Sequence, residues 1–140
     1  MLFRFRLADA HGGAGFAVAA ELPKGLPALA MEDGALETVL ATLIENARQS
    51  GATRLEVTAR DDGPAVRIAL HDNGPGVPEA DRIRIFDPFF TSKREAGGTG
   101  LGLPIARALV EGCGGELELA DSDAGACFVL TLPVAGPVAS

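Results

Sequence analysis

The chain has 140 residues, of which 47% are hydrophobic, and this suits one compact domain with a single core. Its formal charge of -7 argues against nucleic acid as a partner, because binding a phosphate backbone requires a basic face. Charges, glycines or prolines interrupt every apolar stretch before the roughly 20 residues that cross a bilayer, so we expect no direct membrane contact from this domain.

Two strands are predicted ahead of the first helix. Residues 2–7 alternate apolar and basic side chains, which is typical of a strand and lacks the continuous apolar stretch of a secretory signal. Residues 16–21 form the second strand, and residues 12–15 supply a flexible Gly-Gly-Ala-Gly turn. We therefore expect an N-terminal hairpin.

Residues 33–50 carry the strongest helical pattern of the chain. Asp33 offers an N-cap, and Gly51 ends the segment. The apolar residues between them recur with the i, i+3, i+4, i+7 spacing of one buried face, and they are Leu36, Val39, Leu40, Leu43, Ile44 and Ala47.

A second hairpin is predicted after this helix. Residues 54–60 and 65–71 both alternate, and the Asp-Asp-Gly-Pro sequence of residues 61–64 favours a turn between them. Residues 72–102 are expected to be mostly loop, with one helical turn near residues 80–85. Loops of this length in a compact domain are usually functional.

The C-terminal region is expected to repeat the order of helix and hairpin. Residues 103–113 form an amphipathic helix with a proline in its first turn, and residues 116–120 and 126–132 form paired strands. From residue 133 onward we expect the chain to fray. The hairpins predict a mixed, mainly antiparallel sheet with both helices on one face, which is an α/β two-layer sandwich.

Cys113 and Cys127 lie in apolar surroundings and lack CxxC spacing. A cytosolic chain of this size needs no disulfide to hold its core. We expect both to be buried free thiols.

The first candidate site lies on the predicted helix 33–50. Thr42 and Asn46 are four residues apart and share one edge, which borders the apolar stripe. The carboxamide oxygen of Asn46 can bind a hard cation such as Mg²⁺. The alternative is that Asn46 only caps or hydrogen-bonds a neighbouring loop.

The second candidate site is Asp72-Asn73-Gly74-Pro75-Gly76, directly after a predicted strand. A carboxylate fixed at a strand end can accept a hydrogen bond from the exocyclic amine of adenine, where guanine has a carbonyl. Gly74 and Gly76 allow a sharp turn and the close approach of a flat base. An ordinary turn without a ligand is the alternative.

The third candidate site is the glycine-rich sequence of residues 97–104, which opens the second helix. Successive exposed amides at a helix N-terminus favour an anion, usually phosphate. The segment is neither a Walker A loop, because no Gly-Lys-Ser/Thr follows, nor a Rossmann fingerprint, because no strand precedes it. A flexible hinge is the alternative.

The fourth candidate site, residues 85–93, lies between the second and third. Phe86, Phe89 and Phe90 provide enough apolar area to dock a loop on the body of the domain, and Lys93 can reach phosphate oxygens. This pattern favours the hinge of a lid. The alternative is a purely structural aromatic plug with a solvent-exposed lysine.

In this order and spacing, residues 42–47, 72–76, 86–93 and 98–103 closely resemble the N, G1, F and G2 boxes of bacterial sensor histidine kinases. The resemblance covers residues 16–134. Each box is a weak signal alone, whereas four in order with matching secondary structure are specific. The resemblance implies the Bergerat ATP-binding fold, shared with gyrase, Hsp90 and MutL, in which nucleotide lies on the helical side of the sheet under a lid.

The resemblance also implies roles for individual residues. Asn46 would bind Mg²⁺ and Asp72 would recognise adenine, and the domain would position ATP without supplying a catalytic residue of its own. The other residues implied to contact ATP or to form its lid are Gly74, Gly76, Phe89, Phe90, Lys93, Gly98, Thr99, Gly100, Leu101, Gly102 and Leu103.

Two positions depart from the family pattern. The family commonly has asparagine where this chain has Thr42, and a basic then an aromatic residue where it has Gln49 and Ser50. The first change thins the metal shell, and the second removes a stacking partner for the base, although Arg48 is close enough to replace the lost charge. We expect nucleotide binding to survive with modest affinity.

Related ATPases carry a water-activating glutamate one helical turn before the metal asparagine, where this chain has Thr42. Glu45 points about 100° away on the helix and is a poor substitute. A kinase is therefore expected. Neither His11 nor His71 has the helical context of a phospho-acceptor, so we expect the acceptor histidine on a separate domain and no self-labelling.

The sequence thus predicts one ATP-binding catalytic domain over residues 1–134 and a frayed tail over residues 135–140. Expected partners are the histidine-bearing dimerisation domain of the same two-component sensor, absent from this chain, and a cognate response regulator. We expect a cytoplasmic monomer, whether or not the sensor is membrane-anchored. A degenerate docking module for a response regulator and a serine-directed, anti-sigma-factor-type kinase are the alternatives.

Overall fold

The computed structural model describes residues 15–23, 25–88, 90, 102–122 and 124–135. Within these residues, five strands form one sheet in the order β1-β2-β3-β5-β4. The elements in chain order are β1 (Ala17–Glu21), α2 (Asp33–Gln49), β2 (Arg54–Asp62), β3 (Ala65–Asp72), the short 3₁₀ helix η1 (Glu79–Asp81), α3 (Gly102–Gly112), β4 (Glu116–Ala120) and β5 (Cys127–Pro133).

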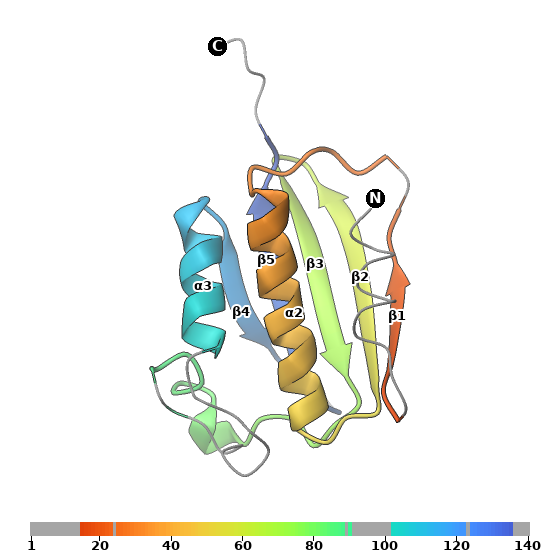
Figure 1. Ribbon diagram of the computed structural model, residues 1–140, viewed down its shortest axis with the longest axis vertical. Coiled ribbons are helices and arrows are strands. Elements are labelled where there is room, and N and C mark those ends of the chain that lie inside the picture. Colours follow the sequence, from red (N-terminus) through yellow and green to blue (C-terminus); the bar gives the residue numbers. More distant parts are fainter. Residues whose placement is uncertain (1–14, 24, 89, 91–101, 123, 136–140) are drawn as a thin grey trace.

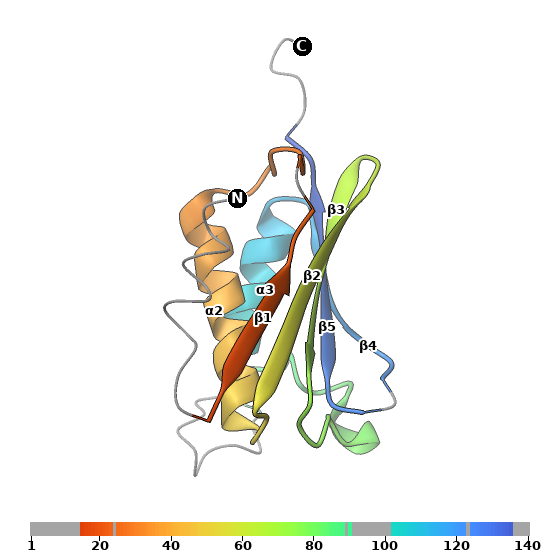
Figure 2. The same ribbon diagram turned by 90° about the vertical axis from the view of Figure 1, so that its right-hand side faces the viewer.

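Both helices cover the same face of the sheet. In Figure 1, α2 (orange to yellow) and α3 (cyan) lie in front of the strands. Figure 2, turned by 90°, shows α2 and α3 side by side on one side of the sheet and the short η1 beyond its lower end. The predicted α/β two-layer sandwich is therefore confirmed.

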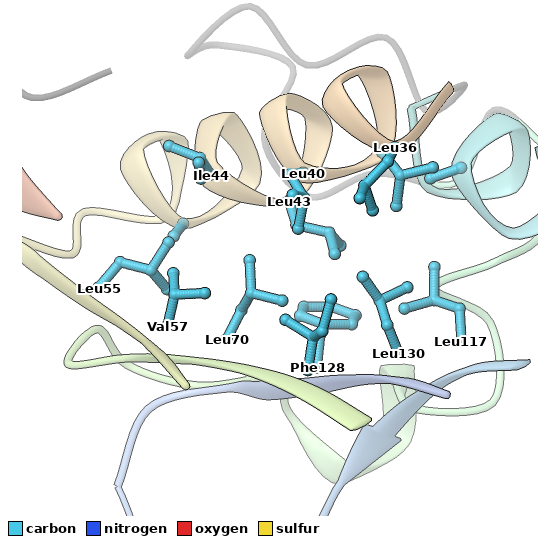
Figure 3. Close-up of a cluster of buried hydrophobic side chains, with 14 of the residues drawn as sticks. Leu36, Leu40, Leu43, Ile44, Leu55, Val57, Leu70, Leu117, Phe128 and Leu130 are labelled. Carbon is cyan, nitrogen blue, oxygen red and sulfur yellow. The ribbon is translucent and has the colours of Figure 1, made fainter. Parts of the chain in front are cut away.

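The core lies between α2, α3 and the inner face of the sheet. Figure 3 shows leucines of α2 pointing toward side chains of four strands. Val39 and Leu40 of α2 and Ile68 and Leu130 of the sheet are fully buried. Because burial of one such side chain contributes about 1.5–3 kcal/mol, this layer holds the helices in fixed positions over the strands.

The sheet is mixed and mainly antiparallel, as predicted. β2 and β3 pair antiparallel from Leu55↔Asp72 to Asp62↔Ala65, so the strands run to the two turn residues Gly63 and Pro64. β5 pairs antiparallel with both β3 and β4. β1 pairs parallel with β2. The partner strand predicted for it, residues 2–7, lies outside the described residues.

Helix α2 begins at Asp33, the residue that was predicted to cap it, and so one residue earlier than expected. Asp33 is the first helical residue, and Glu32 occupies the N-cap position without a side-chain capping bond. The predicted N-cap was therefore wrong, and the Asp33 carboxylate acts only through its favourable place in the first turn. At the other end, the Ser50 hydroxyl donates to the Ala47 carbonyl at 2.8 Å and closes the helix.

The end of β5 is better ordered than the sequence predicts. Val134 donates its N–H to the Pro64 carbonyl and Ala135 to the Ala28 carbonyl, each at 2.9 Å, and Ala30 donates to the Pro133 carbonyl at 2.9 Å. Fraying from residue 133 is therefore wrong for residues 133–135, because the connection before α2 and the turn between β2 and β3 supply backbone partners. Residues 136–140 lie outside the described residues.

The other predicted helical segments and the free cysteines are confirmed, with differences in their bounds and in their burial. The predicted helical turn near residues 80–85 is the shorter η1, and α3 begins at Gly102, one residue before the predicted start. Both cysteines are free, but they are half-buried and not fully buried as expected. No helix in the described part of the chain is long and apolar enough to span a membrane.

Candidate functional site

Three of the predicted motifs meet at one end of the sheet. Figure 1 shows the C-terminal end of α2, the C-terminal end of β3 and the start of α3 together at the lower edge. A Cβ on Gly74 would lie 3.2 Å from the Ser50 hydroxyl oxygen, and a Cβ on Gly102 would lie 3.1 Å from the Thr42 methyl carbon. The fold therefore brings the second half of α2 and its C-cap within contact of the segment after β3 and of the first residue of α3.

Asp72 is a buried carboxylate at this junction, with 5% of its surface exposed. Its Oδ1 accepts hydrogen bonds from the N–H of Gly74 at 2.9 Å and of Ala126 at 3.1 Å. Both donors are rigid backbone groups, and a charged acceptor makes such bonds about twice as strong as neutral ones. The carboxylate is thereby fixed in orientation through one of its two oxygens.

Asn73 locks the turn that follows. Its Oδ1 accepts from the N–H groups of Thr53 and Arg54, each at 2.9 Å, and its Nδ2 donates to the Thr53 hydroxyl at 2.9 Å. Its own N–H donates to the Arg54 carbonyl at 3.1 Å. Asn73 thus ties the end of β3 to the start of β2, a structural role that the motif alone did not assign.

Gly76 adopts a φ of 80°, and a Cβ there would lie 3.0 Å from the Gly125 carbonyl oxygen. Gly125 itself has a φ of 73° and packs against the backbone of Asp72. Glycine is therefore required on both sides of this contact, because a side chain would be strained and would collide. Sequence reasoning found Gly76 but missed Gly125 and Ala126, which are far away along the chain.

Thr42 and Asn46 are half-buried on one edge of α2, as predicted. The Thr42 hydroxyl donates to the Thr38 carbonyl at 2.9 Å, which directs its proton into the helix. The role of Asn46 as a ligand of Mg²⁺ stays a prediction.

Glu45 and Arg48 form an ion pair on α2, with 2.7 Å between Arg48 Nε and Glu45 Oε1. The hydrogen bond to Glu45 and its charge raise the pKa of the Arg48 guanidinium above its ordinary value. Arg48 was expected to replace the charge of a missing basic residue, but here its guanidinium is engaged by Glu45. The Glu45 carboxylate is likewise engaged, because both of its oxygens accept from Arg48 Nε.

The described part of the phenylalanine segment docks on the body of the domain. The Phe86 ring meets the Phe128 ring edge-on with centroids 6.4 Å apart, and the Arg107 guanidinium of α3 lies 4.7 Å from the Phe86 centroid. Arg84 lies 4.6 Å over the Phe90 ring. Aromatic docking is thus confirmed for Phe86 and Phe90. The contribution of Arg107 was missed, because a cation over a ring leaves no local pattern.

Arg82 anchors the same segment at its other end. Its guanidinium donates to the Asp121 carboxylate at 3.0 Å and to the Leu119 carbonyl at 3.4 Å. The segment that follows η1 is therefore attached to the sheet at the end of β4.

The glycine-rich segment is described only from the first residue of α3. Gly102 is exposed there, and Leu103 is half-buried against the core. The remaining predicted residues, Phe89, Lys93, Gly98, Thr99, Gly100 and Leu101, lie outside the described residues.

Known proteins are similar to this chain in sequence and in fold. The profile of the family "Histidine kinase-, DNA gyrase B-, and HSP90-like ATPase" matches residues 32–136. The two-component sensor PprA of Pseudomonas aeruginosa is 42% identical over 111 residues, which are 73% of this chain and 12% of PprA. The chain thus spans only a small part of that relative.

Solved structures agree with the sequence relatives. The ATP-binding domain of PrrB from Mycobacterium tuberculosis superimposes with a TM-score of 0.77 at 28% identity, covering 94% of this chain and 90% of that one. Full-length ShkA in complex with AMPPNP gives a TM-score of 0.75 at 27% identity, covering 95% of this chain and 29% of ShkA. The chain therefore belongs to the family of histidine kinase-, DNA gyrase B- and HSP90-like ATPases, as a domain of the kind found in sensor histidine kinases.

Proposed function

We propose that this chain binds Mg-ATP where α2, the end of β3 and the start of α3 meet, and donates the γ-phosphoryl group to a histidine on a separate dimerisation domain. The observation that carries the proposal is the buried Asp72 carboxylate, which two backbone amides hold by a single oxygen. The complex of the structural relative ShkA with AMPPNP supports nucleotide as the ligand class.

Asp72 suits adenine better than guanine. Its Oδ1 already accepts two hydrogen bonds, so an amine of the ligand would meet Oδ2. The exocyclic amine of adenine is a donor, whereas the carbonyl at the same position of guanine would face a carboxylate with no proton between them. Burial makes that mismatch costly, because water cannot compensate for it. Gly74 and Gly76 would line the base.

Binding of Mg²⁺ would depend on Asn46 and on the phosphate groups of ATP. Within the described residues, no group of three His, Cys, Asp or Glu side chains is placed to hold a metal ion. Mg²⁺ is commonly held by few protein oxygens together with phosphate oxygens and water, and the carboxamide of Asn46 fits that donor set. When bound, the ion would neutralise charge on the phosphates.

The phosphates would lie at the start of α3. Backbone N–H groups at a helix N-terminus and its positive dipole end favour anions, and α3 begins with Gly102 beside Thr42 of α2. Gly98, Thr99, Gly100, Leu101, Gly102 and Leu103 would contact the phosphates, and Phe89, Phe90 and Lys93 would belong to the lid and its anchor.

Phosphoryl transfer to a partner fits this site better than hydrolysis. On α2, Thr42 has no carboxylate and donates its hydroxyl to a backbone carbonyl, and Glu45 is paired with Arg48. The described part of the helix edge therefore offers no base to activate water. His71 bonds the turn after β4 and is not presented on a helix, so the acceptor would be supplied by another domain.

Binding is tested by calorimetric titration with AMPPNP and with the matching guanine analogue, each with and without Mg²⁺. We expect Mg²⁺-dependent binding of the adenine analogue only. Asp72→Asn should lose about 10- to 100-fold in affinity, because it removes the charge while its amide oxygen still accepts the two backbone bonds. Asp62→Asn, an exposed change at the distant hairpin, is the control.

Transfer is tested by adding γ-labelled ATP to this domain alone and together with a separate dimerisation domain. We expect no label on this chain and acid-labile label on the partner's histidine. Label on His11 or His71 would contradict the proposal, and acid-stable label on serine would favour the serine-kinase alternative. Binding of no nucleotide at all would favour a degenerate docking module. Residues 1–134 as the domain, its monomeric state and a response regulator as the second partner belong to the same proposal.

A further inference from the structure

The turn between β4 and β5, of which residues 121–122 and 124–126 are described, is held from both faces of the sheet at the end of β3. Side chains of successive strand residues point to opposite faces, so Asp72 faces the helices while His71 is exposed on the open face. On the helix side, Ala126 donates its N–H to Asp72 Oδ1 at 3.1 Å. On the open side, His71 Nε2 lies 2.7 Å from the Ala124 carbonyl oxygen.

The contact on the open side is a small hydrogen-bonded cluster. A carbonyl oxygen can only accept, so Nε2 of His71 must carry the proton in this contact. The same nitrogen lies 2.9 Å from the Ser122 hydroxyl oxygen, and that hydroxyl donates to the Ala124 carbonyl at 2.7 Å. His71 and Ser122 together therefore fix the carbonyl of Ala124.

Gly125 carries this restraint to the buried side. It adopts a φ of 73°, packs against the backbone of Asp72, and points its carbonyl toward Gly76, where a Cβ would lie only 3.0 Å away. The N–H of Asp72 also donates to the Ala126 carbonyl at 2.9 Å. A shift of the turn would consequently move both a donor to the Asp72 carboxylate and a wall of the Gly76 turn.

We infer that His71 and Ser122 are positioning residues for the adenine-recognising carboxylate, acting through residues 124–126 of the turn between β4 and β5. This inference rests on the proposed function of Asp72. The His71 side chain bonds the turn from the open face, on the other side of β3 from the Asp72 carboxylate, and the Ser122 hydroxyl, within the turn, contacts both His71 and the Ala124 carbonyl. They would set the direction of the Ala126 N–H, which holds Asp72 Oδ1 and leaves Oδ2 for the base.

The test measures the affinity for AMPPNP and for its guanine analogue in single variants. His71→Ala should weaken AMPPNP binding about 3- to 10-fold and reduce the preference for adenine, because the loss of one or two hydrogen bonds loosens the turn. Ser122→Ala should act in the same direction while leaving the histidine in place. His71→Gln should bind within about twofold of the wild type, since its amide N–H can still donate.

The matched control is Arg67→Ala, which removes a side chain from the same face of β3 far from the turn, and it should leave affinity unchanged. Amide NMR spectra check that every variant is folded. Repeating His71→Ala in the Asp72→Asn background distinguishes a positioning role that acts through Asp72 from a purely structural role of His71. With the carboxylate's charge gone, the histidine change should alter AMPPNP affinity by less than about twofold.

A failure of the proposed function of Asp72 and a failure of the positioning role of His71 and Ser122 give different results. If Asp72→Asn binds AMPPNP as tightly as the wild type, the proposed function of Asp72 fails. If Asp72→Asn loses binding while His71→Ala and Ser122→Ala behave like Arg67→Ala, only the positioning role is overturned. An equal loss from His71→Ala in both backgrounds would also overturn it, because the effect would not pass through Asp72.

Discussion

Asn46 lies one helical turn after Thr42 on α2, and the Thr42 methyl group meets the first residue of α3. We expect Asn46→Ala to abolish the gain in ATP affinity that Mg²⁺ provides, while affinity without Mg²⁺ stays within about twofold, since a metal ligand matters only when the metal is present. Titrations of AMPPNP with and without Mg²⁺ measure this. Glu45→Gln, at the neighbouring position, should keep the full Mg²⁺ effect, and an undiminished Mg²⁺ effect in Asn46→Ala would remove Asn46 from the metal shell.

Cys127 lies opposite His71 in the sheet, half-buried and close to Asp72. Burial, and secondarily the charge of Asp72, raise the pKa of the Cys127 thiol above its ordinary 9.0. The folded state therefore holds this proton more tightly than the unfolded state. The resulting stabilisation is complete below the unfolded pKa and is lost as pH rises through the folded pKa.

We accordingly expect the stability of the wild type to fall more steeply between about pH 8 and pH 10 than that of Cys127→Ser, which has no thiol to ionise. Urea unfolding of both proteins in reducing buffer at several pH values measures the difference. Parallel pH profiles would show that this thiol is not linked to folding.

At the residue scale, the sequence predicts groups whose chemistry is local. Asp72, Gly74 and Gly76 could be proposed as base-binding residues because a carboxylate and glycines in one turn already limit what can bind. The Ala126 amide that holds Asp72 could not, because it comes from 54 residues away and any residue except proline has an N–H. His71 was recognised only as an unsuitable phospho-acceptor, since its partner is a backbone carbonyl in a distant turn.

At the element scale, the start of α3 is positioned by its contact with α2. A Cβ on Gly102 would lie 3.1 Å from the Thr42 methyl carbon, closer than ordinary packing allows. We expect Gly102→Ala to displace the N-terminus of α3 and to lower AMPPNP affinity by about 3- to 10-fold, a cost of roughly 1 kcal/mol of overpacking.

Thr42→Ser should relieve this crowding in the Gly102→Ala variant. It removes the methyl group and keeps the hydroxyl that bonds the Thr38 carbonyl. The double variant should recover most of the lost affinity, as measured by the same titration. If Thr42→Ser fails to rescue Gly102→Ala, the contact between the two helices does not set the site.

The elements themselves were largely predictable, but their order in the sheet was not. Helical periodicity placed α2 and α3, and alternation with turn residues placed β2, β3, β4 and β5, because both signals are local. Alternation says which face a residue occupies but not which strand lies beside it. The insertion of β5 between β3 and β4 therefore had to come from the structure, and it is this pairing that brings Ala126 to Asp72.

At the scale of the whole molecule, the two faces of the sheet have different roles. The helices cover one face, and the motifs gather at one end of that layer. The open face carries charged residues such as Arg54 and Glu56, which form an exposed ion pair. A surface ion pair of this kind contributes little to stability, so the fold depends on the helical layer that also forms the site.

The measurement that tests the central claim most directly is an amide NMR titration of this domain with AMPPNP and Mg²⁺. We predict that the largest shifts will occur at Asn46, Gly74, Gly76 and Leu103, with little change at Arg67 on the open face. Shifts concentrated on the open face or at the β2–β3 turn, or none at saturating nucleotide, would contradict a nucleotide site between α2, the end of β3 and α3.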